Sequence, residues 1–134
     1  SRVAAAVLDY MARNELAENS KKQGELLLQG LKEIRDSQAC VGDVRGLGLM
    51  CGVEFVQDKA TREPFPPGMK VAERVMDACL DRGLIVFPGH GTVDGTAGDH
   101  LLLGPPLVIT AGEVKQMLAI LEEGIAAVQK TIAA

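Results

Sequence analysis

The chain has 134 residues, of which 47% are hydrophobic and 3% are aromatic, and its formal net charge is −4. This length and composition predict one folded domain with a core of aliphatic side chains. The negative charge and the scarcity of aromatic rings argue against a nucleic-acid partner, which needs a basic surface and often stacking rings. No apolar run is long enough to span a membrane, so we expect no membrane partner.

Three cysteines, Cys40, Cys51 and Cys79, lack CxxC spacing. An odd and sparse set is typical of a reducing compartment, so we expect a cytoplasmic protein. Cys51 and Cys79 lie in apolar patterns and are predicted to be small core residues rather than nucleophiles. The chain starts without Met and almost directly in a helical pattern. This indicates a piece of a longer protein, with a processed mature protein as the alternative.

The first third of the chain is predicted to be helical. Apolar residues recur on one helical face over 3–13 and again over 16–36, with charged residues between them. Gly24 and Gly30 interrupt the second pattern. Glycine costs about 1 kcal/mol relative to alanine inside a helix, so we interpret both as points of close packing on a neighbour.

Between Val41 and Gln57 the apolar period changes to two. Leu47, Leu49, Cys51, Val53 and Phe55 alternate with their neighbours and predict a single strand with one apolar face. The glycines within this run indicate a bulge or the close approach of another backbone. Their GxGxxxG spacing inside a strand pattern does not match a dinucleotide-binding loop.

A polar, proline-rich loop over 58–68 leads into a third predicted helix over 69–82, which ends at Gly83. The apolar run 84–87 is predicted as a short strand ended by Pro88. The following stretch, 89–98, contains four glycines. It is interpreted as a loop at the surface or along a site. His90 and Asp94 within it, and Asp99 and His100 just after it, lack the spacing of a structural metal site, so we expect no metal.

The most distinctive stretch runs from Asp99 to Thr110 and reads DHLLLGPPLVIT. It predicts a buried strand over 101–103, a rigid Gly-Pro-Pro corner and a long final helix that Thr110 and Glu113 start as a capping box. The element order α-α-β-α-β-β-α predicts an α+β fold. We expect a two-layer sandwich, in which helices cover one face of a small antiparallel or mixed sheet.

Four segments in order carry a resemblance: VGDVRGLGLMCGVEF, EPFPPG, RGLIVFPG and GDHLLLGPPLVIT. Together they resemble the C-terminal (small) domain of class III aminotransferases, fold-type I enzymes that depend on pyridoxal 5'-phosphate (PLP). The resemblance covers essentially the whole chain. It implies that residues 1–36 are helices linking to a missing large domain and that 37–134 form the small domain.

The resemblance implies amino-group transfer between an amine or amino acid and a 2-oxo acid in a homodimeric full-length enzyme. In the family the large domain carries the lysine that forms a Schiff base with PLP, which acts as an electron sink. That lysine would precede Val3. Each lysine of this chain is predicted on a polar helix face or in a loop, so we expect no catalytic or cofactor-binding residue here and no PLP on this fragment alone.

The small domain is then expected to line the substrate entrance, with His90, Thr92, His100, Leu102 and Pro105 as pocket residues. Ornithine-type members of the family place an arginine three residues before the first proline of the corner, where it binds a substrate carboxylate bidentately. Here that position is Leu102. This departure leaves carboxylate recognition to another group or to a different substrate.

Two alternatives follow from the same residues. The chain is a self-standing α+β binding module that dimerises through its sheet, or it is part of a PLP-dependent lyase, mutase or decarboxylase built on the same domain. Leu102 keeps the second alternative open, because it removes the residue that would have indicated the substrate.

Overall fold

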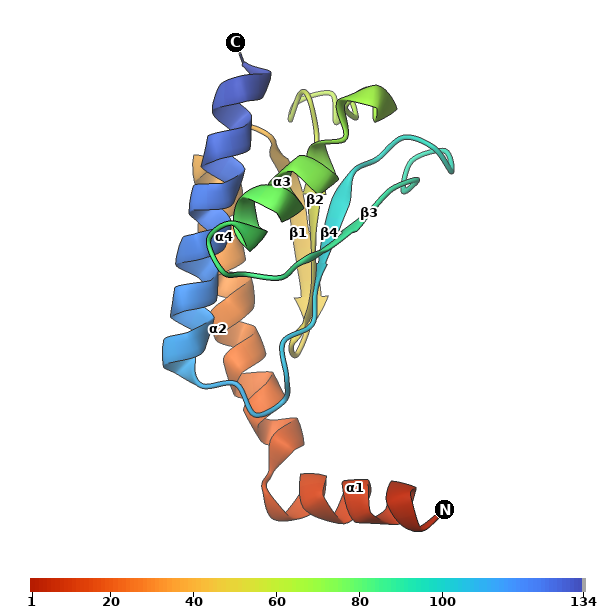
Figure 1. Cartoon of the computed structure of the whole chain (residues 1–134), viewed down its shortest axis with the longest axis vertical. Coiled ribbons are helices and arrows are strands. Elements are labelled where there is room, and N and C mark those ends of the chain that lie inside the picture. The colour runs from red at the N-terminus through yellow and green to blue at the C-terminus, as the bar shows by residue number, and fades with distance from the viewer. Residues whose placement is uncertain (134) are drawn as a thin grey trace.

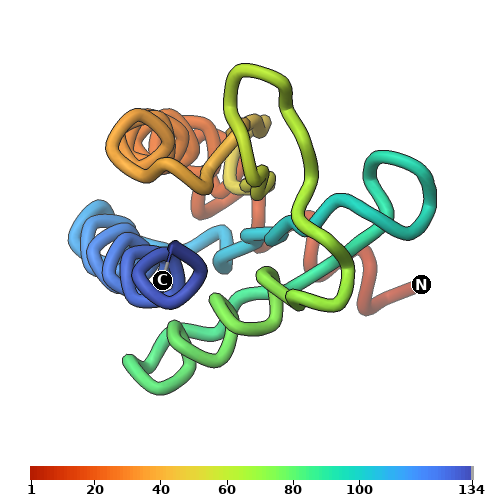
Figure 2. Tube along the Cα trace, turned by 90° about the horizontal axis from the view of Figure 1, so that it is seen from above, coloured from red at the N-terminus to blue at the C-terminus, as the bar shows by residue number. Residues whose placement is uncertain are grey.

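The computed structural model describes residues 1–133. It contains four α-helices, four strands and a short 3₁₀ helix: α1 (Arg2–Arg13), α2 (Leu16–Ser37), β1 (Val41–Leu47), β2 (Met50–Phe55), η1 (Pro67–Met69), α3 (Val71–Leu80), β3 (Phe87–Gly89), β4 (His100–Leu103) and α4 (Ala111–Ile132). The strands pair antiparallel in the order β1-β2-β4-β3. Helices α2, α3 and α4 lie on one side of this sheet (Figures 1 and 2). The predicted α+β two-layer fold is confirmed.

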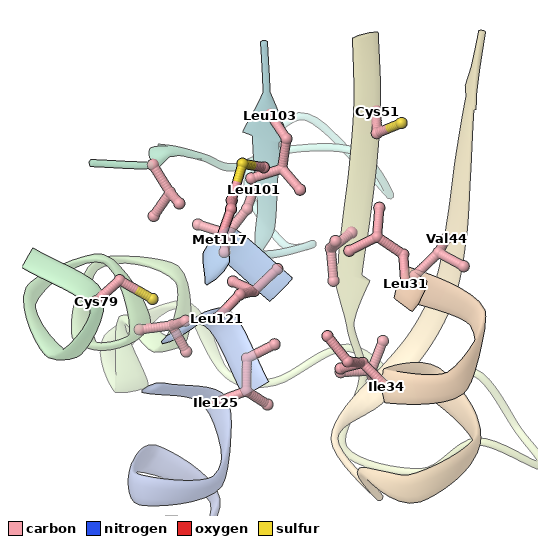
Figure 3. Close-up of a cluster of buried hydrophobic side chains, with 14 of the residues drawn as sticks. Leu31, Ile34, Val44, Cys51, Cys79, Leu101, Leu103, Met117, Leu121 and Ile125 are labelled. Atoms are coloured by element: carbon pink, nitrogen blue, oxygen red, sulfur yellow. The ribbon is translucent and has the colours of Figure 1, made fainter. Parts of the chain in front are cut away.

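The core lies between the sheet and these three helices and is aliphatic, as expected from the composition. Leu31 and Ile34 of α2, Leu121 and Ile125 of α4 and Leu101 of β4 belong to this core, and all five are buried (Figure 3). Helix α1 extends away from this body and buries none of its residues (Figure 1). None of the described helices is both long and apolar enough to cross a membrane.

The prediction of a single strand between Val41 and Gln57 is wrong, because the chain reverses there. Leu47 pairs with Met50, so Gly48 and Leu49 form a two-residue hairpin turn. Gly48 has a φ of 56°, which glycine adopts without strain. Leu47, expected on the apolar face, is 90% exposed on the opposite side of the sheet. Alternation alone did not distinguish one long strand from two strands joined by a tight turn.

The strand predicted over 84–87 is also misplaced. The strand β3 begins at Phe87 and continues through Pro88, which stands opposite Leu101 of β4. Because β3 is the edge strand, the missing N–H of proline removes no ladder hydrogen bond from a central strand. The chain before it, from the end of α3 at Leu80, contributes no strand pairing.

The interpretation of Gly24 and Gly30 as close-packing points is confirmed. A Cβ on Gly24 would lie 2.1 Å from the carbonyl oxygen of Gly48, and one on Gly30 would lie 2.3 Å from Cδ1 of Leu118. At Gly24, helix α2 therefore approaches the backbone of the β1–β2 turn more closely than a side chain allows. At Gly30 it packs against the movable side chain of Leu118 on α4.

We predict that Gly24→Ala destabilises the protein by about 1–3 kcal/mol, since overpacking against backbone forces the helix and the turn apart. Gly112→Ala is the matched control, because its added Cβ would meet nothing nearer than 4.0 Å. Denaturant unfolding of both variants measures the difference. Equal stability of the Gly24 and Gly112 variants would show that α2 yields at this contact.

Candidate functional site

One face of the sheet carries no helix, and its central strands present side chains there by simple alternation. In β4, Leu101 and Leu103 point into the core, whereas His100 and Leu102 point to this open face. Leu102 pairs with Gly52 of β2 on one side and with Phe87 of β3 on the other. We call this surface the open face. Its apolar side chains include Leu47, Met50, Phe87 and Leu102, which are 90%, 77%, 72% and 51% exposed.

A hollow of about 350 Å³ lies on the open face over Gly52. The space exists because Gly52 has no side chain. A Cβ added there would meet only the carbonyl oxygen of Leu101, at 3.8 Å. The structure brings Thr92, His100 and Leu102, three of the residues expected at the pocket, together around it. Arg45, considered from the sequence only as an alternative carboxylate-binding group, and Glu54, which the sequence did not indicate, add two charged side chains to its wall.

The charged groups of this hollow are already paired with one another. Arg45 donates one hydrogen bond to Asp43 over 2.7 Å and another to Glu54. The hydrogen bond to Glu54, followed by that to Asp43, raises the pKa of Arg45 above its usual value. With one positive and two negative charges in this group, Arg45 is not free to bind a substrate carboxylate.

His100 stands between Glu54 and Gly89 in the register of the sheet. Gly89 makes room for its ring, since an added Cβ would lie 2.4 Å from Nε2 of His100. Its Nδ1 is buried and has no hydrogen-bond partner among the described residues. The ring is therefore held by packing and keeps one polar atom unused.

A larger apolar groove of about 940 Å³ adjoins the hollow and is lined in part by Pro105, another of the five predicted pocket residues. Leu102 and Met50 border both spaces, so the two are continuous around these side chains. Phe87 and Val108 also line the groove. Of the five predicted pocket residues, Leu102 is the one that connects the hollow with the groove.

The Gly-Pro-Pro corner is held in place by a residue that the sequence did not indicate as part of the site. Nδ2 of Asn19 on α2 donates to the carbonyl oxygens of Leu107 and Ile109 at 2.7 and 3.1 Å. Gln23, which is 6% exposed, donates in turn to the side chain of Asn19 at 3.2 Å. The sequence did contain a signal for this contact, because Asn19 and Gln23 are two polar residues four positions apart on the apolar face of α2.

The corner then passes into α4 through the capping box that the sequence predicted. Oγ1 of Thr110 accepts the amide of Glu113 at 3.3 Å, and Oε2 of Glu113 accepts the amide of Thr110 at 2.8 Å. These hydrogen bonds satisfy two backbone donors at the helix start and thereby fix the direction in which the corner leaves the sheet.

His90, the fifth predicted pocket residue, does not line either space. Its Nδ1 lies 2.7 Å from Oδ1 of Asp99 and its Nε2 lies 2.8 Å from Oε1 of Glu73. The hydrogen bond with Asp99, together with that to Glu73, raises the pKa of His90 above its usual value. Atoms of this trio lie within 4.8 Å of one another, but both ring nitrogens are already hydrogen-bonded. The geometry is that of an ion-pair cluster.

Neither thiol nor lysine chemistry is available at these surfaces. Burial raises the pKa of Cys40 and of Cys79 to about 11 and also raises the pKa of Cys51. These thiols stay protonated at neutral pH, as expected for core residues. No lysine lines the hollow or the groove among the described residues. These surfaces therefore do not by themselves fit PLP, whose covalent attachment needs a lysine.

Comparison with known proteins defines the class to which this fold and corner belong. A family model for aminotransferase class-III matches residues 1–125. Among solved structures, a transaminase from the marine bacterium Virgibacillus superposes with a TM-score of 0.89 at 35% identity, over 97% of this chain and 28% of that one. An omega-transferase from Vibrio fluvialis JS17 gives 0.86 at 30% identity, over 98% and 29% of the two chains.

The chain therefore belongs to the class III aminotransferase family. Relatives include the uncharacterized aminotransferase YodT of Bacillus subtilis (strain 168), 35% identical over 98% of this chain and 30% of the relative. The uncharacterized aminotransferase C1771.03c of Schizosaccharomyces pombe is 42% identical over 91% of this chain and 27% of the relative. The chain thus spans less than a third of the length of either relative.

We predict that Asn19→Ala destabilises the protein by about 1–3 kcal/mol, because it leaves two partly buried carbonyl groups of the corner without a donor. Gln29→Ala is the control on the same helix, where an exposed amide bonds only to Glu33. It should change the stability by less than about 0.5 kcal/mol. Urea unfolding gives both values, and hydrogen exchange of residues 104–110 locates the loss. A loss confined to α2 would contradict this assignment.

Proposed function

We propose that this chain is the small C-terminal domain of a PLP-dependent aminotransferase that moves an amino group between an amine or amino acid and a 2-oxo acid. The observation that carries the proposal is the family match over residues 1–125, joined to relatives of which the chain spans less than a third. The absence of a lysine from the linings of both spaces supports assigning cofactor binding to the part of the protein outside this chain.

The open face is proposed to pack on that larger part. A monomeric surface with Leu47, Met50 and Phe87 all strongly exposed is unusual, and apolar patches of this kind mark contacts with other protein surfaces. The same reasoning supports α1 as a connecting helix, since Val3 and Leu8 are 74% and 66% exposed. The division into a linking segment over 1–36 and a domain over 37–134 stays a prediction, as do the homodimer and the cytoplasmic location.

Thr92, His100, Leu102 and Pro105 are proposed to edge the substrate entrance. Leu102 places an apolar group where ornithine-type relatives are expected to have arginine, and the neighbouring Arg45 is bound to two carboxylates. The surface therefore suits an apolar or uncharged part of the substrate. We infer that any substrate carboxylate is bound by residues outside this chain.

The test is an assay of the protein as its gene encodes it, with pyruvate or 2-oxoglutarate as amino acceptor. We expect amino transfer by that protein and none by residues 1–134 alone. When the isolated chain is incubated with PLP and then reduced with borohydride, no single lysine should carry a stoichiometric phosphopyridoxyl group. Release of ammonia or phosphate without amino transfer would instead indicate a lyase of the same family.

We predict that Leu102→Arg in the whole protein lowers KM for 2-oxoglutarate relative to pyruvate by about tenfold, as expected for one charge-assisted hydrogen bond to the second carboxylate. Leu102 is 51% exposed, so the fold should tolerate the change. Leu80→Arg introduces the same charge on α3, where Leu80 is 53% exposed and lines neither space. Equal effects of both variants would place Leu102 away from the substrate.

A further inference from the structure

The loop between β3 and β4, residues 90–99, is closed at its base by one histidine and two carboxylates. We call it the β3–β4 loop. His90 and Asp99 directly follow the last strand pair at this end, Gly89 with His100. The two side chains meet across the loop at 2.7 Å, and His90 also contacts Glu73 of α3 at 2.8 Å. The base of the loop is thus joined both to itself and to a helix.

The geometry favours a protonated His90. Both ring nitrogens face a carboxylate oxygen at hydrogen-bond distance. A neutral imidazole has a single N–H, so its second nitrogen would direct a lone pair at a carboxylate oxygen. The imidazolium has two N–H groups and donates to both carboxylates in charge-assisted hydrogen bonds. The raised pKa of His90 agrees with this geometry.

The other charged groups of these segments are engaged elsewhere or point to solvent. Asp94 accepts two backbone amides of the loop at 2.8 and 2.6 Å, and Arg74 on α3 donates to Thr131. The second carboxylate oxygen of Asp99 accepts the first amide of α3 at 3.0 Å. Lys70, just before α3, is exposed. The groups that face His90 are therefore one carboxylate from α3 and one from the end of the loop.

The rest of the loop is tied together internally. Val93 donates its amide to the carbonyl of Ala97 at 3.1 Å, and Oγ1 of Thr92 donates to the carbonyl of Gly98 at 3.3 Å. A compact loop whose ends lie close together is held in shape by its own contacts. Its position therefore depends on the contacts at its base, and Thr92 moves with it at the edge of the hollow.

We propose that protonated His90 is a latch that holds the β3–β4 loop closed against α3 and sets the position of Thr92 beside the hollow. His90 is a positioning residue in this device and touches neither space itself. The proposal does not depend on amino transfer, because it is tested by hydrogen exchange at the backbone amides of the loop and not by activity.

The sign of the pH effect follows from the raised pKa of His90. The latch is complete while the ring is protonated and is lost as the pH rises through that raised value. Above that pKa the neutral ring of His90 has a single N–H, so it can donate to only one of the two carboxylates. The loop is then held by a single contact and opens more often.

Hydrogen–deuterium exchange read by mass spectrometry tests this on the protein as its gene encodes it, in EDTA so that protons and not cations are titrated. Protection of peptides covering 88–100 is normalised at each pH to the unfolded protein. We expect it to fall about fivefold from mildly acidic to mildly alkaline solution, the scale of a partly exposed ion pair. Peptides covering the histidine-free loop 57–66 should show no such change.

His90→Gln and Glu73→Gln should both show low protection of the loop that no longer varies with pH. Asp77→Asn is the matched control, since it removes an exposed carboxylate from the same helix and should behave as the wild type. A wild-type loop with the same protection throughout the pH range overturns the proposal, and this result needs no variant. So does a His90→Gln loop as protected as the wild type in acid, or a loss of equal size in Asp77→Asn.

Discussion

The buried carboxylate of Asp99 is the constraint on which the surrounding structure depends. Its side chain is 3% exposed, and a charge so placed is costly unless hydrogen bonds satisfy it. One oxygen accepts the first amide of α3 and the other contacts His90, while its backbone carbonyl accepts the amide of Phe55 at 2.9 Å. One residue thereby aligns the end of β2, the start of α3 and the base of the β3–β4 loop.

The same residue determines which side chains reach the open face. Strand β4 begins at His100, immediately after Asp99, and side chains alternate from there along the strand. With Asp99 fixed, His100 and Leu102 must point away from the helices and Leu101 into the core. The hollow, the apolar groove and the loop beside them all adjoin a strand that is anchored by the residue just before it.

Features determined by nearby residues could be predicted from the sequence, and those that depend on distant contacts could not. The capping box of Thr110 and Glu113 spans three positions and was found. The strand predicted over 101–103 was found at His100–Leu103, but it is not buried throughout, since Leu102 is 51% exposed. Strand alternation also concealed the turn at Gly48, where the apolar pattern continues across a chain reversal. The cluster around His90 needs Glu73, seventeen positions away, and no local pattern links the two residues.

The charges and side chains of the open face both indicate that the edge around Leu102 does not bind a carboxylate. Leucine has no donor for a carboxylate, and the guanidinium of Arg45, which lines the same hollow, faces two carboxylates, one on its own strand and one on β2. That group holds one positive charge against two negative ones, so a further anion beside it would be repelled. Replacing Leu102 with arginine adds a donor for a carboxylate but does not remove the excess negative charge around Arg45. An arginine at position 102 therefore binds a carboxylate against this local excess of negative charge, which limits its effect to that of one charge-assisted hydrogen bond.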